Sequence, residues 1–175
     1  MKKITPLFAL LSLFLYVSCM ESSDEHSWRV ENEEFMAALA DSTGIYPLEK
    51  MDSVITVEAG AKYEPIVPTG EYYKVLTQGT GRRPVVGETV KVNYTGKFYD
   101  GTVFDSGCSS FDVAYGSIID GFYLALQRMR VGDRWVVYIP YWLGYGSTTY
   151  YYASPSIPAY SALIFDMELR EIEED

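Results

Sequence analysis

The ionisable and nucleophilic side chains exclude most enzyme chemistries before any element is considered. The single histidine, His26, lies in a polar stretch near the N-terminus, so no Ser-His-Asp triad, histidine base or histidine metal site is expected in the main domain. Cys108 is the one thiol of that domain, and one thiol cannot form a redox or zinc pair. The carboxylates show no metal-loop spacing, and no phosphate-cradling glycine loop precedes a basic residue. We therefore expect no metal and no cofactor.

The aromatic side chains are what remains, with sixteen tyrosines, eight phenylalanines and three tryptophans. An apolar surface of this kind can bind chain segments, and it can catalyse a reaction that needs no proton transfer. Rotation about an X–Pro amide is such a reaction, because its barrier of ~18–20 kcal/mol comes from amide resonance. The planar amide is more dipolar than the twisted transition state, so an apolar pocket favours the latter.

The first nineteen residues resemble a bacterial targeting signal. Lys2 and Lys3 precede an apolar run over residues 4–17, which is shorter than the ~20 residues that span a bilayer. The run matches the apolar region of a secretory signal. It ends in Ser18 and Cys19, a sequence similar to the box at which bacterial lipoproteins are cleaved and lipidated.

This pattern predicts a lipoprotein signal peptide over residues 1–18 and a lipid on Cys19 that anchors the protein to a membrane. The expected location is the cell envelope, at the outer membrane on its periplasmic or surface face. The alternative is an ordinary cleaved signal in which Cys19 is incidental. The formal charge of −10 lacks the basic stripe that nucleic-acid binding needs, so nucleic acid is excluded as a partner.

Residues 19–68 are expected to form an acidic tether, a short helix and a linker. Residues 20–27 are polar and acidic, which indicates a tether. Apolar residues at helical spacing predict a helix over residues 28–40, which either packs on its own domain, the default, or supports docking or dimerisation. Residues 45–68 mix apolar residues with glycine and proline, which indicates an extended linker with one strand at most.

Residues 69–174 show the crisp alternation of a sheet. Period-two patterns predict strands near residues 71–77, 90–95 and 163–170, and an apolar run predicts another at 135–139. The only helix expected here covers residues 120–129. These elements predict an α+β fold, with an antiparallel β-sheet wrapped around one short α-helix.

Five segments of this region, in order, resemble the FKBP-type peptidyl-prolyl cis/trans isomerase family. They are residues 87–96 (GETVKVNYTG), 100–106 (DGTVFDS), 131–135 (VGDRW), 139–146 (IPYWLGYG) and 157–169 (IPAYSALIFDMEL). Each is weak alone, but their order over about residues 69–174 is specific. The resemblance implies an FKBP-like domain over residues 69–174.

By that resemblance, ten residues line a proline pocket. They are Tyr94, Phe104, Asp105, Phe111, Ile118, Ile119, Phe122, Tyr145, Ile157 and Phe165. Tyr145 would offer its hydroxyl to a ligand carbonyl, and the Ile157 N–H would be a second donor. Asp105 would lie at the rim with Tyr94 and orient bound amides, so Tyr94, Asp105 and Tyr145 are the candidate catalytic residues.

Simpler interpretations stand beside these roles. Tyr94, Phe104 and Phe165 occupy inward strand positions typical of an ordinary core, and Asp105 could cap a turn. Tyr145 lies between two glycines in a loop, which packing explains poorly.

Two departures from the family pattern are visible. Phe122 stands where the family usually has Trp, which predicts a modestly larger pocket. The loop 147–156 is longer than usual and contains Tyr150, Tyr151 and Tyr152. We expect these tyrosines to overhang the pocket and to select the residues that flank the proline.

The expected function is that of a peptidyl-prolyl cis/trans isomerase that binds proline-containing polypeptides and assists the folding of exported proteins, for which X–Pro isomerisation can limit the rate. The alternative is a non-catalytic FKBP-fold interaction module in an envelope lipoprotein assembly, since a fold does not guarantee turnover.

Overall fold

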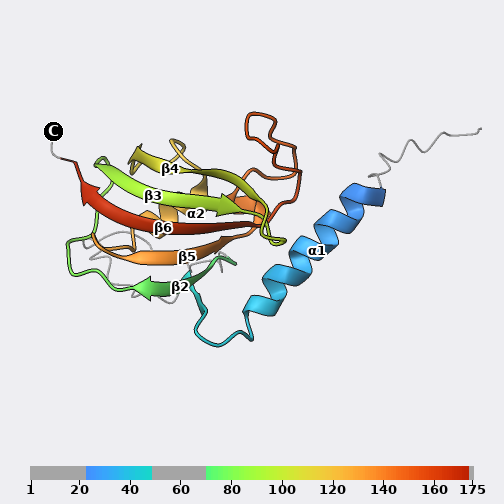
Figure 1. Cartoon of the computed structure of the whole chain (residues 1–175), viewed down its shortest axis with the longest axis horizontal. Helices are drawn as coiled ribbons and strands as arrows, with labels where there is room; N and C mark the ends of the chain where they lie inside the picture. Colours follow the sequence, from blue (N-terminus) through green and yellow to red (C-terminus); the bar gives the residue numbers. More distant parts are fainter. Residues whose placement is uncertain (1–22, 49–69, 174–175) are drawn as a thin grey trace, which may run out of the picture.

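The computed structural model describes residues 23–48 and 70–173, in which one antiparallel sheet carries two helices (Figure 1). The sheet has six strands in the order β1-β2-β5-β6-β3-β4. Their bounds are β1 (Tyr46–Pro47), β2 (Tyr72–Thr77), β3 (Thr89–Lys97), β4 (Val103–Asp112), β5 (Arg134–Ile139) and β6 (Leu163–Ile172). The helices are α1 (Ser23–Leu39) and α2 (Asp120–Leu126), and a 3-10 turn, η2, covers Tyr141–Leu143. The predicted α+β class is confirmed.

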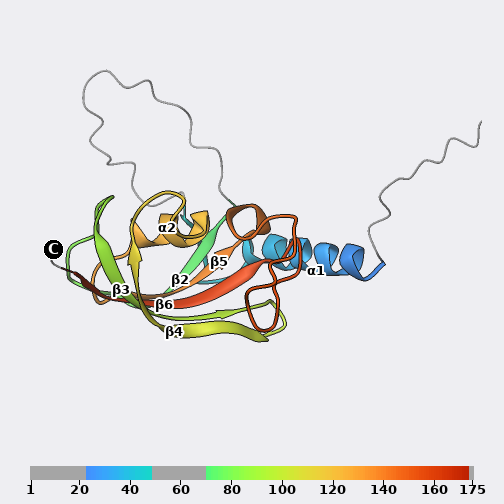
Figure 2. The same ribbon diagram turned by 90° about the horizontal axis from the view of Figure 1, so that it is seen from above.

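The core lies between α2 and the face of the sheet that α2 covers (Figure 2). Alternate residues of β3 point into it, so Val90 and Val92 are fully buried while the residues between them are not. Helix α2 approaches β5 closely because Gly121 has no side chain: a Cβ there would lie 2.4 Å from the side chain of Ile139. This close approach fixes α2, and with it the residues at its N-terminal end.

Helix α1 lies against the end of the sheet and packs on its own domain, which is the default expectation (Figure 1). Trp28 donates its indole N–H to Ser161 Oγ at 3.0 Å, and its ring contacts Phe98 at a centroid distance of 5.6 Å. Asn32 is buried and accepts the backbone N–H of Ala162 at 2.8 Å. Two hydrogen bonds therefore join the helix to the segment before β6, and ring packing joins it to Phe98, directly after β3.

The structure corrects two predicted boundaries. Helix α1 begins at Ser23 and not at residue 28, so the last part of the predicted tether is helical. Asp24 and Glu25 lie in its first turn, where acidic side chains interact favourably with the helix dipole. Helix α2 ends at Leu126 and not at residue 129, because the chain tightens into an i→i+3 turn at Arg128.

Several predictions fall outside the described residues. They concern the signal peptide over residues 1–18, the lipid on Cys19 and most of the linker 45–68. Only residues 45–48 of this linker are described, and they contain the short strand β1. None of the helices in the described part of the chain is long and apolar enough to cross a membrane.

Candidate functional site

A pocket opens where the N-terminal end of α2 meets β3, β4 and β6. Its cavity has a volume of about 520 Å³. The residues that line it are Tyr94, Asp105, Phe111, Gly116, Ser117, Ile118, Ile119, Asp120, Phe122, Gly144, Tyr145, Tyr150 and Phe165. Eight of the ten predicted pocket residues are among them, and the lining comes from three neighbouring strands, one helix and two loops.

Phe122 forms the floor of the pocket. Its ring contacts Phe111 at a centroid distance of 5.1 Å and Phe165 at 5.3 Å, the latter edge-to-face. Edge-to-face pairs of this kind are favoured by the ring quadrupoles. Gly96 of β3 leaves room for this packing, because a Cβ there would lie 2.8 Å from the Phe165 ring. The floor is therefore a rigid set of interlocked rings.

The rim carries the polar groups. The Tyr94 hydroxyl donates to Asp105 Oδ2 at 3.1 Å, which orients the carboxylate across the β3–β4 pair. Asp105 lies within β4, so the interpretation of this residue as a turn cap is wrong. Burial raises the pKa of Tyr94, and Asp105 beside it raises it further. The phenol therefore stays protonated, and remains a donor, throughout the physiological pH range.

Tyr145 is half-buried and lines the same cavity as Tyr94. Burial raises the pKa of its hydroxyl, and Tyr150, Asp105 and Tyr94 add to the effect. Its ring stacks on Tyr150 at a centroid distance of 4.4 Å and an interplanar angle of 28°. Tyr145 is thus a neutral hydrogen-bond donor held by packing. The backbone N–H groups of Gly144 and Gly146, on either side of it, both donate to the carbonyl of Tyr141 in η2, which fixes this loop.

The loop 147–156 reaches the pocket, as predicted, through one of its three tyrosines. Tyr150 lines the pocket, whereas Tyr152, 91% exposed, lines only an adjoining cavity. Tyr151 is 77% exposed and lines neither cavity. The expectation that all three overhang the pocket is therefore wrong for Tyr151, which lines neither cavity, and for Tyr152, which lines only the adjoining one.

The adjoining cavity has a volume of about 470 Å³ and contains the two predicted residues that the pocket does not. It is lined by Val103, Phe104, Asp105, Ser106, Tyr145, Tyr150, Tyr152, Ala153, Ser154 and Ile157. Phe104 and Ile157 are buried core residues that close its inner wall. The core interpretation of Phe104 and Phe165 is thus correct and also compatible with lining a cavity.

The Ile157 N–H is not available to a ligand, which corrects the role expected for it. It donates to the Tyr150 carbonyl at 2.9 Å, and the Tyr150 N–H donates back to Ile157 at 2.8 Å. This pair of bonds fixes the loop and consumes the donor. Sequence reasoning could not detect this pairing, because it depends on how the long loop folds back on itself.

Sequence reasoning also missed pocket residues. Ser117 and Asp120 flank the predicted Ile118 and Ile119 and line the same cavity. Their position in the sequence could have indicated them, because a short turn that leads into a helix exposes successive residues to the same cavity. Asp120 adds a second carboxylate to the lining of the pocket, besides that of Asp105.

The arrangement suits recognition of an apolar, amide-containing ligand. It combines a ring floor, two neutral phenols and a carboxylate. Within residues 23–48 and 70–173, no group of three His, Cys, Asp or Glu residues is placed to hold a metal ion. The described Cys108 is a free, exposed thiol on β4, away from the pocket.

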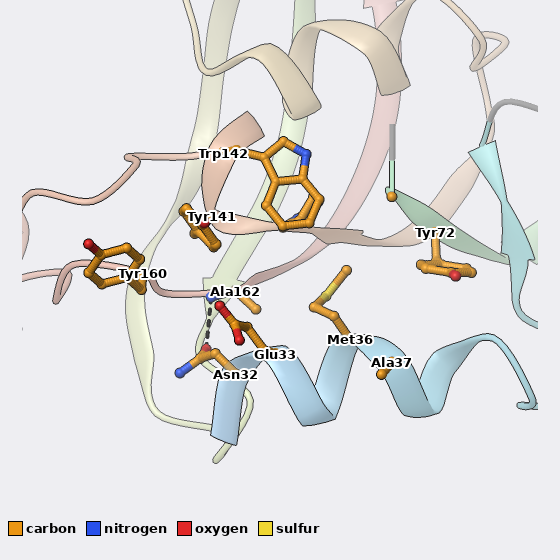
Figure 3. A pocket seen from close by; sticks show the side chains of 11 residues that line it. Asn32, Glu33, Met36, Ala37, Tyr72, Tyr141, Trp142, Tyr160 and Ala162 are labelled. Atoms are coloured by element: carbon orange, nitrogen blue, oxygen red, sulfur yellow. Dashed lines mark hydrogen bonds between the residues drawn. The ribbon is translucent and has the colours of Figure 1, made fainter. Parts of the chain in front are cut away.

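Another ring-lined cavity, separate from the pocket and its adjoining cavity, lies beneath α1 (Figure 3). It has a volume of about 370 Å³. Trp142 overhangs it from η2, Met36 and Ala37 face it from α1, and Tyr72 closes one end (Figure 3). The hydrogen bond between Asn32 and Ala162 lies at its other end and is internal to the helix interface. This cavity is a gap in the packing of α1, and hydrophobic side chains account for most of its wall.

Comparisons with known proteins agree with this geometry. The family model for the FKBP-type peptidyl-prolyl cis-trans isomerase matches residues 80–170, just over half of the chain. The chain is 40% identical over 126 residues to the FKBP-type 22 kDa peptidyl-prolyl cis-trans isomerase of Escherichia coli, covering 69% of this chain and 60% of that protein. It is 42% identical over 86 residues to the outer membrane protein MIP of Legionella longbeachae, covering 46% and 36%.

A solved structure, the peptidyl-prolyl cis-trans isomerase of Pseudomonas syringae, superimposes with a TM-score of 0.66 at 26% identity, covering 85% of this chain and 96% of that one. The chain spans between about half and three fifths of the length of the first curated relatives that it matches. The matched residues contain β3, β4, α2, β5 and nearly all of β6, which together build the pocket. This chain belongs to the family of FKBP-type peptidyl-prolyl cis-trans isomerases.

Proposed function

We propose that the protein is an active peptidyl-prolyl cis-trans isomerase whose catalytic site is the pocket over Phe122. The observation that carries the proposal is the convergence of Tyr94, Asp105, Tyr145 and the ring floor on one open cavity of about 520 Å³. That cavity is large enough for a prolyl ring and the amide before it. The chemistry needs no more than these groups, because it breaks no covalent bond.

In this proposal the prolyl ring lies on Phe122, between Phe111 and Phe165. Contact with these rings removes the X–Pro amide from water, which costs the dipolar planar form more than the twisted form. The hydroxyl of Tyr145 holds a substrate carbonyl, and one such hydrogen bond contributes about 1 kcal/mol. Because each 1.36 kcal/mol changes a rate about tenfold, a few such effects give a useful catalyst.

A second donor comes from the backbone before α2. The first N–H groups of a helix have no partner within it. Ile119 is the N-cap residue of α2 and lines the pocket. Its carbonyl accepts the N–H of Tyr123, whereas its own N–H makes none of the described backbone hydrogen bonds. We assign to this N–H the role that the sequence had suggested for Ile157.

Asp105 positions the substrate and does not transfer a proton. Its carboxylate accepts from Tyr94 at 3.1 Å and still has free lone pairs toward the cavity. A substrate N–H that follows the proline can donate to them. The pair Tyr94 and Asp105 then fixes the peptide on one side, while Tyr145 holds it on the other.

The proposed substrates are proline-containing polypeptides of the cell envelope, and the proposed anchor is a lipid on Cys19. The basic start, the apolar run and the Ser18-Cys19 pair of the N-terminal sequence support export and lipidation. One relative is named as an outer membrane protein, which supports the same membrane for this chain. Mass spectrometry of the mature protein, extracted from membranes, tests this: a diacylglycerol-modified N-terminal cysteine is expected, and an unmodified one contradicts the anchor.

The activity is tested with the protein from residue 20 onward and a proline test peptide. We expect it to accelerate the cis-to-trans relaxation of the peptide, and Tyr145→Phe to lower kcat/KM about fivefold by removing one hydrogen bond. Asp105→Asn, which keeps the shape of the side chain but removes its charge, should lower it several-fold.

The control is Tyr151→Ser, in the same region but outside both cavities, which should retain the wild-type rate. Circular dichroism establishes that each variant is folded. Relaxation at the spontaneous rate with correctly folded wild-type protein would overturn the enzyme and leave the non-catalytic binding module.

A further inference from the structure

The pocket and its adjoining cavity share three residues, which makes them two parts of one binding surface. Asp105, Tyr145 and Tyr150 line both. The stacked rings of Tyr145 and Tyr150, 4.4 Å apart, therefore form a partition with the proline pocket on one side and the second cavity on the other. A polypeptide that places its proline over Phe122 can extend past this partition into the second cavity.

From this arrangement we infer that the second cavity is a binding site for a lysine or arginine side chain of the same polypeptide. The inference rests on the proposed function, because it names the class of substrate that the isomerase site prefers. The cavity would bind the cationic side chain of a residue close to the proline, while the proline itself occupies the first pocket.

The lining of the second cavity fits a cation better than an anion or an aliphatic chain. Its polar groups are the Asp105 carboxylate, the hydroxyls of Ser106 and Ser154, and the phenols of Tyr150 and Tyr152. All of these can accept a hydrogen bond, and aromatic faces attract cations through their quadrupole. A long alkyl stem with a charged tip is the side chain that matches such a mixed surface.

No positive charge competes for the site. Among the described residues that line either cavity there is no Lys or Arg, while Asp120 adds a second negative charge at the mouth. Arg134, which lies on the neighbouring polar surface beside Tyr94, is held by Asp166 in two hydrogen bonds of 2.8 Å. The formal charge of −10 further enriches cationic segments near the protein.

The walls are formed before a ligand arrives. Tyr150 is fixed through its backbone by the two hydrogen bonds to Ile157, and the Ala159 N–H donates to Thr149 Oγ1 at 3.3 Å. The ring of Tyr152 contacts that of Tyr150 at a centroid distance of 5.5 Å. Because the cavity is already shaped, little ordering of the loop opposes binding.

The test is a series of peptides with one proline and an otherwise alanine-rich sequence. Lysine, arginine, glutamate or norleucine is placed in turn at each of the two positions before and after the proline. At low salt we expect lysine and arginine, at one of these positions, to raise kcat/KM about three- to fivefold over alanine. Glutamate should lower it, and norleucine, which keeps the stem but not the charge, should change it little. The advantage of lysine should shrink in 0.5 M salt.

Variants locate the effect. Tyr152→Ser removes an exposed ring of the second cavity, so the lysine-to-alanine ratio should fall toward one, whereas Tyr151→Ser should leave the ratio as in the wild type. A ratio of one at every position, or norleucine equal to lysine, would overturn the inference while activity on the alanine peptide keeps the proposed function intact. If turnover is absent, fluorescence anisotropy of the same labelled peptides gives the ratio as dissociation constants, with the same two outcomes.

Discussion

The pocket over Phe122 and the cavity beneath α1 are both lined by aromatic rings, but they differ in what their polar groups do. In the pocket over Phe122, the hydroxyl of Tyr145 and the carboxylate of Asp105 face the opening. In the cavity beneath α1, the amide of Asn32 is engaged at both ends, donating to the Trp28 carbonyl at 2.7 Å and accepting from the Ala162 N–H at 2.8 Å. Rings alone therefore do not make a site.

This difference separates function from stability. Hydrogen bonds within the α1 interface fix the helix on the domain, so their loss should lower stability and leave the chemistry unchanged. Polar groups at the mouth of the pocket should have the opposite effect, because they have partners to gain from a substrate. Substitutions at matched positions in the two regions can break this comparison or sharpen it.

The largest effect is expected for Asn32→Ala. The substitution leaves the N–H of Ala162, a residue that is 1% exposed, without its acceptor. A buried donor that loses its partner costs about 1–3 kcal/mol, so the free energy of unfolding in urea should fall by that amount. The rate of isomerisation per folded molecule should stay at the wild-type value.

Glu34→Ala, at an exposed position of the same helix, is the control and should change the stability little. If Asn32→Ala lowered the rate and not the stability, α1 would be coupled to the pocket through η2, and the separation of the two regions would be lost.

A smaller effect is expected when the α1 cavity is filled by Ala37→Leu. Ala37 lines this cavity together with Met36 and Trp142 (Figure 3). Burying part of three carbon atoms contributes about 1 kcal/mol, which raises Tm by ~2–4 °C. Ala38→Leu, exposed and outside the cavity, is the matched control and should give no gain. An equal gain for both variants would mean that helix propensity, and not the cavity, is responsible.

The smallest effect concerns Glu71, between two residues that line the α1 cavity. It is fully buried, and burial raises the pKa of its carboxyl well above the ordinary value, against a smaller opposing effect of Arg128. The folded protein therefore favours the protonated form, so this contribution to stability is present near pH 4.5 and is lost as the pH rises through the raised pKa.

Glu71→Gln should accordingly raise Tm at pH 8 and leave it nearly unchanged near pH 4.5. Thermal unfolding followed by circular dichroism at the two pH values measures this. A variant that is less stable than the wild type only at pH 8 would show that the carboxylate is favourably paired when charged, contrary to the expectation from burial.

The pocket could be predicted from the sequence to the extent that it is built by strands and one helix. Tyr94 and Phe165 occupy inward positions of regular strands and Phe122 lies in the first turn of a short helix, so the resemblance to the family could be carried onto them residue by residue. The bounds of the elements were less predictable: α1 starts at Ser23, because a polar, acidic segment is also a good first turn of an exposed helix.

The loop 147–156 marks the limit of such prediction. Its length and its tyrosines indicated a role at the pocket, but not which ring would lie there. Only Tyr150 stacks on Tyr145, and the same fold of the loop consumes the Ile157 N–H. No periodicity governs a loop, so its geometry depends on contacts that form after the sheet has assembled.

The sequence by itself determined the kind of chemistry available: with one histidine outside the domain and a wealth of rings, catalysis had to rely on burial and hydrogen bonds. It also indicated the residues of the pocket floor, through the order of the motifs that resemble the FKBP family. Only the tertiary structure decided that Tyr145 and Tyr150 divide the binding surface in two and that α1 is docked by Trp28 and Asn32. These features join segments far apart in the chain, and such contacts are set by packing and not by local pattern.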